Sequence, residues 1–121
     1  MIFIKNKNQY DLEERTLIFA KKVRQFIKKL PKTIGNFEDA SQLIRSSGSV
    51  GANYREANDS LSKKDFLMKI KICRKEAKES QYWLQIIDIG NKKELEKERK
   101  ELINESIELM KIFISIMRKS Q

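Results

Sequence analysis

The amino-acid sequence predicts an all-α fold, an antiparallel up-down-up-down four-helix bundle in one domain spanning residues 1–121. The chain holds one Pro and four Gly, and 36% of its residues are charged, which is typical of a mostly helical protein. Apolar residues recur in steps of three and four along most of its length. Side chains suited to capping a helix N-terminus precede each periodic segment. These signals together predict helices at about 12–30, 37–59, 63–89 and 92–119.

The segment 62–89 has the clearest helical pattern, and the rest of the chain is organised around it. Ser62 is a suitable N-cap with Asp65 three residues on, and Gly90 is a natural stop after the helix. Apolar or small residues repeat along one face with the spacing of a heptad seam. We expect this face to lie in the core; it comprises Phe66, Ile70, Cys73, Ala77, Ser80, Leu84 and Ile87.

The first predicted helix begins after Asp11, which caps it with Glu14 at the capping-box position. It ends before Pro31, because the residue before a proline avoids the α region. Its seam consists of Leu12, Thr16, Phe19, Val23, Phe26 and Leu30.

The second predicted helix has Asn36 as its cap with Asp39 three residues on, and its seam is Ala40, Leu43, Ser47, Val50, Tyr54 and Ala57. Gly48 and Gly51 interrupt it, and each costs about 1 kcal/mol relative to Ala in a helix. Either small residues here let a neighbouring helix approach closely, or a loop breaks the segment in two. We favour the continuous helix because the seam keeps its phase through the glycines.

The fourth predicted helix, capped by Asn91 with Glu94, is apolar over much of its girth. One seam is Leu95, Leu102, Ser106, Leu109, Phe113 and Ile116. An adjacent line is Ile103, Ile107, Met110, Ile114 and Met117. So wide an apolar surface needs more than one partner, so this helix is either the most buried in the bundle or an oligomer contact.

The balance of charge favours an acidic partner. The chain has 26 Lys+Arg against 17 Asp+Glu, a formal net charge of +9, and a sequence pI of about 9.7. Such a balance suits nucleic acid or an anionic membrane surface, although solubility alone accounts for a somewhat smaller charge. The positive excess falls on the first and third predicted helices and in the connections.

Several classes of function are disfavoured by what the chain lacks. It has no histidine, which argues against zinc and excludes Ser-His and Cys-His catalysis. Its one cysteine, Cys73, cannot form an intrachain disulfide, which fits a reducing compartment. No apolar run is long enough to span a membrane, and residues 1–5 lack the apolar region of a signal peptide. We expect a cytoplasmic protein that is not an enzyme and uses no cofactor or metal.

A basic stripe is the first candidate site. On the third predicted helix, lysines and a tyrosine lie about 120–180° from the seam, at 100° per residue, and three bases on the first helix lie opposite its own seam. Together they are suited to contacting phosphates, with the tyrosine available for stacking on a base; the alternative is an ordinary solvated face. The candidate nucleic-acid-binding residues are Lys21, Arg24, Lys28, Lys64, Lys71, Lys75, Lys78 and Tyr82.

An apolar flank on the third helix is the second candidate, formed by Ile72, Trp83 and Ile86 and interrupted by Glu76 and Glu79. Surface aromatics beside apolar residues are typical of interfaces, so we predict an oligomer contact here. The alternative is packing against the fourth helix of the same chain.

A polar set on the second and third helices is the third candidate. If these side chains lie inside the bundle, they must satisfy one another, because an unpaired buried charge is costly. Nothing in their spacing suggests a substrate cavity, so we predict a structural network, in which Asn53 lies opposite Lys69 and Ser46 opposite Glu76. Its members are Arg45, Ser46, Ser49, Asn53, Glu56, Lys69 and Glu76.

Several phrases of the sequence, taken together, resemble a known family. They are Asp11-Leu12-Glu13-Glu14-Arg15-Thr16, Phe19-Ala20, Gln42-Leu43, Arg45-Ser46-Ser47, Ser49-Val50-Gly51-Ala52-Asn53-Tyr54, Glu56-Ala57, Ser62-Lys63, Asp65-Phe66, Lys75-Glu76-Ala77, Glu79 and Tyr82-Trp83-Leu84. This combination is similar to bacterial four-helix-bundle proteins encoded in intervening sequences of 23S ribosomal RNA genes. The resemblance covers residues 10 to about 90, and the fourth helix only in general character.

The resemblance implies a ring-like homopentamer. It also implies kinship with the accessory variability protein of diversity-generating retroelements, a basic pentamer that binds nucleic acid and a reverse transcriptase. The gene's location in ribosomal RNA does not by itself establish a ribosomal role. We therefore expect a self-associating bundle that binds RNA or DNA through phosphates; the alternative is a protein–protein interaction scaffold that binds no nucleic acid.

Overall fold

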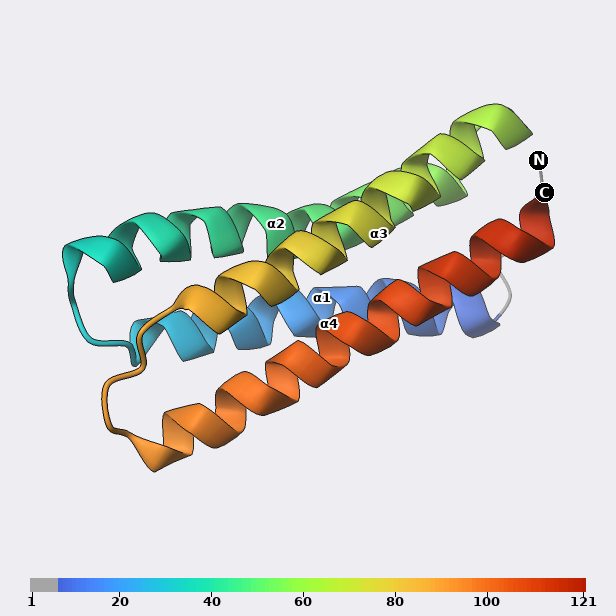
Figure 1. Ribbon diagram of the computed structural model, residues 1–121. Coiled ribbons are helices and arrows are strands. Elements are labelled where there is room, and N and C mark those ends of the chain that lie inside the picture. The colour runs from blue at the N-terminus through green and yellow to red at the C-terminus, as the bar shows by residue number, and fades with distance from the viewer. Residues whose placement is uncertain (1–6) are drawn as a thin grey trace.

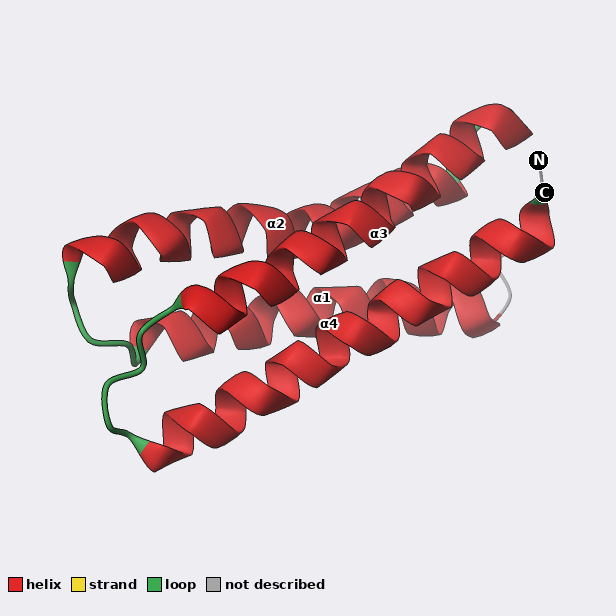
Figure 2. Ribbon diagram, in the orientation of Figure 1, coloured by secondary structure: helices red, strands yellow, loops and turns green. Residues whose placement is uncertain are grey.

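The computed structural model describes the backbone of residues 7–121 and the side chains of residues 12–121. Within this range the chain forms four helices and no strand (Figures 1 and 2). The helices are α1 (Lys7–Lys28), α2 (Ile34–Asn58), α3 (Lys63–Ile86) and α4 (Lys93–Ser120). The all-α prediction is confirmed for the described residues.

Each helix packs against two others. The contacting pairs are α1 with α2, α2 with α3, α3 with α4, and α1 with α4. Within the described residues α1 does not contact α3, and α2 does not contact α4, so these pairs are diagonal. The connections 29–33 and 87–92 lie together at one end of the bundle, and the 59–62 turn lies at the other (Figure 1). This packing is that of a four-helix bundle.

The apolar seams are confirmed as the core. All the seam residues of the first two predicted helices are buried, from Leu12 to Leu30 and from Ala40 to Ala57, although α1 ends at Lys28 and Leu30 lies in the connection after it. On α3, Phe66 is half-buried against the core and the other seam residues are buried. On α4, Ile116 alone of its seam is only half-buried. The second apolar line of α4 is half-buried throughout, so its members cover the side of the core and do not fill its centre.

Three of the predicted helix starts need correction. α1 begins at Lys7, so Asp11 lies within the helix backbone and is not its N-cap; its side chain lies outside the described residues. α2 begins after Thr33, whose Oγ1 accepts a hydrogen bond from the Asn36 amide at 3.1 Å. α4 follows Lys92, which makes no side-chain capping bond, so Asn91 is not the cap either.

The predicted start of α3 is confirmed, whereas its predicted end is wrong. Ser62 is the N-cap, and its Oγ accepts from the Asp65 amide at 3.1 Å, as predicted. The helix ends at Ile86 and not at residue 89, so Gly90 does not terminate it directly. Gly90 instead has a φ of +67° within the connection, and its amide donates to Asp88 Oδ1 at 2.8 Å.

Asn36 is buried in the first turn of α2 because it holds the two neighbouring connections together. Its Nδ2 donates to the carbonyl oxygens of Pro31 (2.9 Å) and Asp88 (2.8 Å). Its Oδ1 accepts from the Asp88 amide at 3.0 Å. The side chain of Asn36, which the sequence predicts to be a helix cap, therefore bonds instead to residues of the two connections.

α2 runs without interruption through Gly48 and Gly51, as predicted. A Cβ on Gly51 would lie 2.9 Å from Thr16 Oγ1, closer than real Cβ atoms approach, and 3.2 Å from Thr16 Cβ, which is also a tight contact. The absence of a side chain therefore lets α1 cross α2 closely at this level, and the close-approach interpretation is confirmed.

Candidate nucleic-acid interface

The outward face of α3 carries the first part of the basic stripe. Lys64, Lys71, Lys75 and Lys78 are all exposed, and Tyr82 is 55% exposed at the end of the same line. They are exposed because the seam on the opposite side of the helix is buried against α2 and α4. Among the side chains described, no carboxylate lies within ion-pair distance of these lysines. Their charge is therefore free to meet an anion.

The second part of the stripe, on α1, is less uniform. Lys21 and Lys28 are exposed, whereas Arg24 is half-buried. Arg24 Nη1 donates to the carbonyl of Ala20 at 3.0 Å, and Nη2 donates to that of Ile44 on α2 at 3.4 Å. Arg24 thus contributes to helix packing, and its donors are partly committed.

The structure does not bring these two parts together. α1 and α3 are diagonal in the bundle and do not contact each other within the described residues. A single copy of the chain therefore presents two separate basic surfaces, one on each helix. The sequence located the exposed lysines, but helix periodicity carries no information about which helices are neighbours.

The apolar flank of α3 lies on the side facing α2. Two contacts identify the side of α3 that faces α2: Lys69 pairs with Glu56, and Ser80 bonds to Ser46. At 100° per residue, Ile72 and Trp83 lie on this same side of α3. The alternative of packing against α4 would need the opposite side of α3. Ile72 and Trp83 are half-buried, Trp83 packs on the core, and Ile86 is 43% exposed. The rings of Tyr82 and Trp83 meet edge to face at 5.0 Å.

The polar set on α2 and α3 forms small local contacts. Ser80 Oγ donates to Ser46 Oγ at 3.0 Å, and the partner of Ser46 is therefore four residues, one helical turn, beyond Glu76. Lys69 Nζ lies 3.5 Å from Glu56 Oε1, at the edge of the helix pair. Asn53 Nδ2 donates to the carbonyl of Ser49 within α2 at 2.9 Å.

The two remaining members of the set behave differently. Arg45 is exposed, and among the described residues no contact joins it to the others. Partial burial raises the pKa of the Glu76 carboxyl, and the neighbouring Glu79 raises that pKa further. Only Ser46 of the seven is fully buried, so the set is mostly a polar edge along the junction of α2 and α3.

Cys73 is a core residue. It is buried on the α3 seam, and burial raises the pKa of its thiol to about 12. The thiolate is the reactive form of cysteine, so this side chain is held inert near neutral pH.

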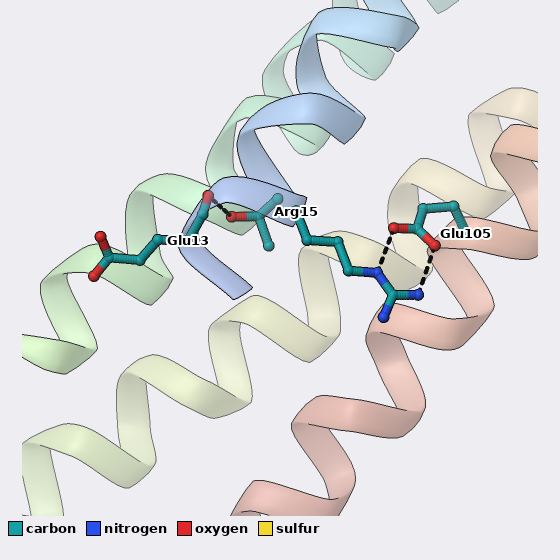
Figure 3. A network of polar contacts seen from close by, with 4 residues as sticks. Glu13, Arg15 and Glu105 are labelled. Atoms are coloured by element: carbon teal, nitrogen blue, oxygen red, sulfur yellow. Dashed lines mark hydrogen bonds and ion pairs between the residues drawn. The ribbon is translucent and has the colours of Figure 1, made fainter. Parts of the chain in front are cut away.

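Two long-range ion pairs were not predicted from the sequence. Arg15 of α1 forms a two-pronged ion pair with Glu105 of α4, with Nε–Oε2 at 2.7 Å and Nη2–Oε1 at 2.8 Å (Figure 3). The hydrogen bond to Glu105 raises the pKa of Arg15. Lys29, the residue that follows the end of α1, pairs with Glu98 of α4 at 3.1 Å. Partners this far apart in the chain leave no signal in helix spacing.

Large apolar side chains are exposed at both ends of the bundle, which was not predicted from the sequence. Ile34 is 87% exposed and Phe37 is 78% exposed, both on the first turn of α2. Phe37 lines a groove of about 720 Å³ between the end of α1 and the start of α2. At the opposite end of the bundle, Leu61 is 94% exposed in the turn before α3. Exposed large apolar side chains beside a groove are typical of a contact surface.

Within the described residues, no helix is apolar over a length sufficient to cross a membrane. The same part of the chain contains no cluster of three Cys, Asp or Glu side chains placed to hold a metal ion.

The fold and surface define a class: a small, basic, all-α four-helix protein with an exposed lysine row. The chain belongs to the 23S rRNA-intervening sequence protein family, whose family model matches residues 8–115. It is also similar to the crystal structure of a protein of unknown function from the S23 ribosomal protein family of Bacteroides thetaiotaomicron VPI-5482. That similarity has 34% identity and a TM-score of 0.75, and it covers 87% of this chain and 96% of the other. No protein with a curated description matches this chain.

Proposed function

We propose that this protein is a non-enzymatic, self-associating bundle with up-down-up-down connectivity that binds RNA or DNA through phosphate contacts. The observation that carries the proposal is the row of Lys64, Lys71, Lys75 and Lys78 on α3, exposed and free of ion pairs among the described residues. The family resemblance implies a homopentamer, and the exposed apolar residues of the surface support self-association.

The row suits a nucleic-acid backbone in length and chemistry. Lys64 and Lys78 are fourteen residues apart, about 21 Å along a helix. Lysine is a flexible point charge that contacts phosphate without reading sequence. Four such contacts would release counterions with a slope of log K against log salt of about −3 to −4. Tyr82 offers a face on which an unpaired base can stack.

Fluorescence anisotropy with a labelled stem-loop RNA, a single-stranded RNA and a single-stranded DNA tests the proposal. We expect binding at low salt that weakens with the slope above and depends little on base sequence. The triple variant K71E/K75E/K78E should lose most of the affinity. The charge-matched control K92E/K97E/K100E, on the same chain but away from α3, should lose much less. No binding at low salt, or equal losses in both variants, would overturn the proposal.

A second candidate is a protein-interaction scaffold that binds no nucleic acid. It is favoured by the exposure of Ile34, Phe37 and Leu61, which a phosphate-binding surface does not require. Pull-down from native lysate with and without nuclease separates the two functions. A protein partner retained after nuclease treatment, with no RNA or DNA bound by the pure protein, would favour the scaffold.

A further inference from the structure

α4 carries most of its acids on one side. Glu98 and Glu105 pair with basic side chains at the edge of α1, so they identify the side of α4 that faces α1. At 100° per residue, three more carboxylates fall on this side. The acid row so formed consists of Glu94, Glu98, Glu101, Glu105 and Glu108. Four of these five carboxylates line a groove of about 610 Å³ between α1 and α4, and a phosphate backbone is repelled from that face.

The second half of α4 carries basic side chains on its outer surface. Arg99 Nη1 donates to the carbonyl of Ile87 at 2.8 Å, which identifies the side of α4 that faces α3. Lys111 and Arg118 lie about 100–120° further round, and both are exposed. Lys111 contacts Glu108 at 3.4 Å in an exposed pair, and Arg118 has no ion-pair partner among the side chains described. Exposed pairs of this kind are weak, so both cations are available to a phosphate.

α3 turns basic side chains toward the same face. Lys69 and Ser80 mark its α2 side. Lys71, Arg74 and Lys78 fall on the other side of its seam, toward α4, and all three are exposed. Arg74 was not among the predicted residues. The carboxylates of α3 lie on its α2 side or between that side and the outer surface; they are Asp65, Glu76 and Glu79.

The basic side chains of α3 and α4 form two neighbouring rows. Both helices run side by side away from the connection 87–92 (Figure 1). Counting equal numbers of residues from the Arg99–Ile87 bond places Lys111 level with Lys75 and Arg118 between Lys64 and Lys71. The α3 row comprises Lys64, Lys71, Arg74, Lys75 and Lys78, and the α4 row comprises Lys111 and Arg118.

The strip between the two rows carries no acid among the described residues. On α4 it consists of Ile107, Met110 and Ile114, which are half-buried. Packed helix axes lie about 8–10 Å apart, so the two rows are separated by about 10 Å. A pair of cationic rows with an uncharged strip between them is suited to two phosphate backbones.

We propose that the outer face of α3 and α4 binds a base-paired stem of RNA or DNA, with one cationic row on each strand. This inference rests on the nucleic-acid binding in the proposed function and names the class of nucleic acid. A single strand has one backbone and follows one row, whereas a stem presents two backbones across a groove. The grooves of B-DNA are about 6 and 12 Å wide, and A-form RNA has a wide, shallow minor groove. Rows about 10 Å apart therefore reach phosphates on both sides of one groove.

The number of phosphate contacts distinguishes a stem from a single strand. The two rows together offer seven contacts to a stem, for which the slope of log K against log salt is about −6. A single strand on the four lysines of α3 has a slope of about −3. The double variant K111E/R118E should reduce the slope for a stem by about 2 and leave the affinity for a single strand within about twofold of wild type.

Fluorescence anisotropy of the full-length protein over a range of salt concentrations tests the inference. The probes are a blunt RNA duplex of about 10 base pairs, a DNA duplex of the same length and an unstructured single-stranded RNA. The α3 row is about 21 Å long, or about six base pairs, so one copy spans most of such a duplex. The control variant K92E/K97E makes the same change of charge near the start of α4 and should keep the wild-type slope for a stem. Helical circular dichroism checks the fold of each variant.

A steeper slope for either duplex than for the single strand, reduced in K111E/R118E but not in the control, supports the inference. Equal slopes for duplex and single strand overturn it and leave the proposed function intact, and this comparison on wild type needs no variant. Wild-type affinity of K111E/R118E for both duplexes also overturns it. Failure of all three probes to bind at low salt removes the proposed function and, with it, this inference.

Discussion

Gly48 and Gly51 are close neighbours on α2, yet the structure predicts opposite effects for the same substitution at the two positions. Replacing Gly by Ala within a helix gains about 1 kcal/mol of stability when the new methyl group has room. At Gly48 the nearest atom is Arg24 Nη2 at 3.3 Å, the far end of a flexible side chain. At Gly51 the nearest atoms are Thr16 Oγ1 at 2.9 Å and Thr16 Cβ at 3.2 Å.

The difference follows from what each neighbour can do. The guanidinium of Arg24 can move by a few tenths of an ångström, so Gly48→Ala should stabilise the protein by about 0.5–1 kcal/mol. Thr16 is buried, and its Oγ1 donates to the Glu13 carbonyl at 3.0 Å, so it cannot turn away freely. Overpacking of this kind costs about 1–3 kcal/mol and offsets the helix gain. Gly51→Ala should therefore be about 2 kcal/mol less stable than Gly48→Ala.

Urea unfolding followed by circular dichroism, at one protein concentration for all variants, measures the difference. Thr16→Ala with Gly51→Ala completes a double-mutant cycle, since removing Oγ1 relieves the closest contact and should recover part of the loss. Equal stability of the two glycine variants, or a more stable Gly51→Ala, would refute the claim that α1 and α2 approach at this residue.

Three further predictions follow from single contacts. Asn36→Ala should lower the free energy of unfolding by about 2–4 kcal/mol, because it leaves buried groups of the two connections without partners. Thr33→Ala removes only the N-cap of α2 and should lower it by about 1 kcal/mol. Urea midpoints that rank the two variants in the opposite order would contradict this. Arg15→Met should lower the free energy of unfolding by less than about 1 kcal/mol, and by less still in high salt, because the ion pair with Glu105 is partly exposed. A larger loss of stability that salt leaves unchanged would contradict this reasoning. The pKa of the Cys73 thiol is about 12 in the folded chain against 9.0 for an unperturbed cysteine thiol, so the unfolded chain loses this proton at lower pH. The free energy of unfolding should therefore fall as pH rises from about 9 to about 12. Cys73→Ala should show a shallower fall over that range, and identical pH profiles of the variant and the wild type would exclude the effect.

The sequence by itself determined which face of each helix is buried. The period of a helix and the position of each apolar residue together specify its inward side, and this needs no knowledge of the partner. For that reason the seams on α1 and α2 were predicted residue by residue, and the lysines of α3 were predicted to be exposed. Ser62 was recognised as a cap because its bond to Asp65 is formed within four residues of chain.

Only the tertiary structure decided which helices are neighbours and what their outer sides meet. Asn36 reads as a cap in the sequence but is held by Asp88, fifty-two residues away, and Thr33 is the cap instead. Trp83 lies toward α2, and the two basic helices are diagonal, because the order of packing depends on all four helices at once. Helix periodicity is a local property of the chain, whereas neighbours, grooves and exposed ends such as Phe37 result from packing between distant segments.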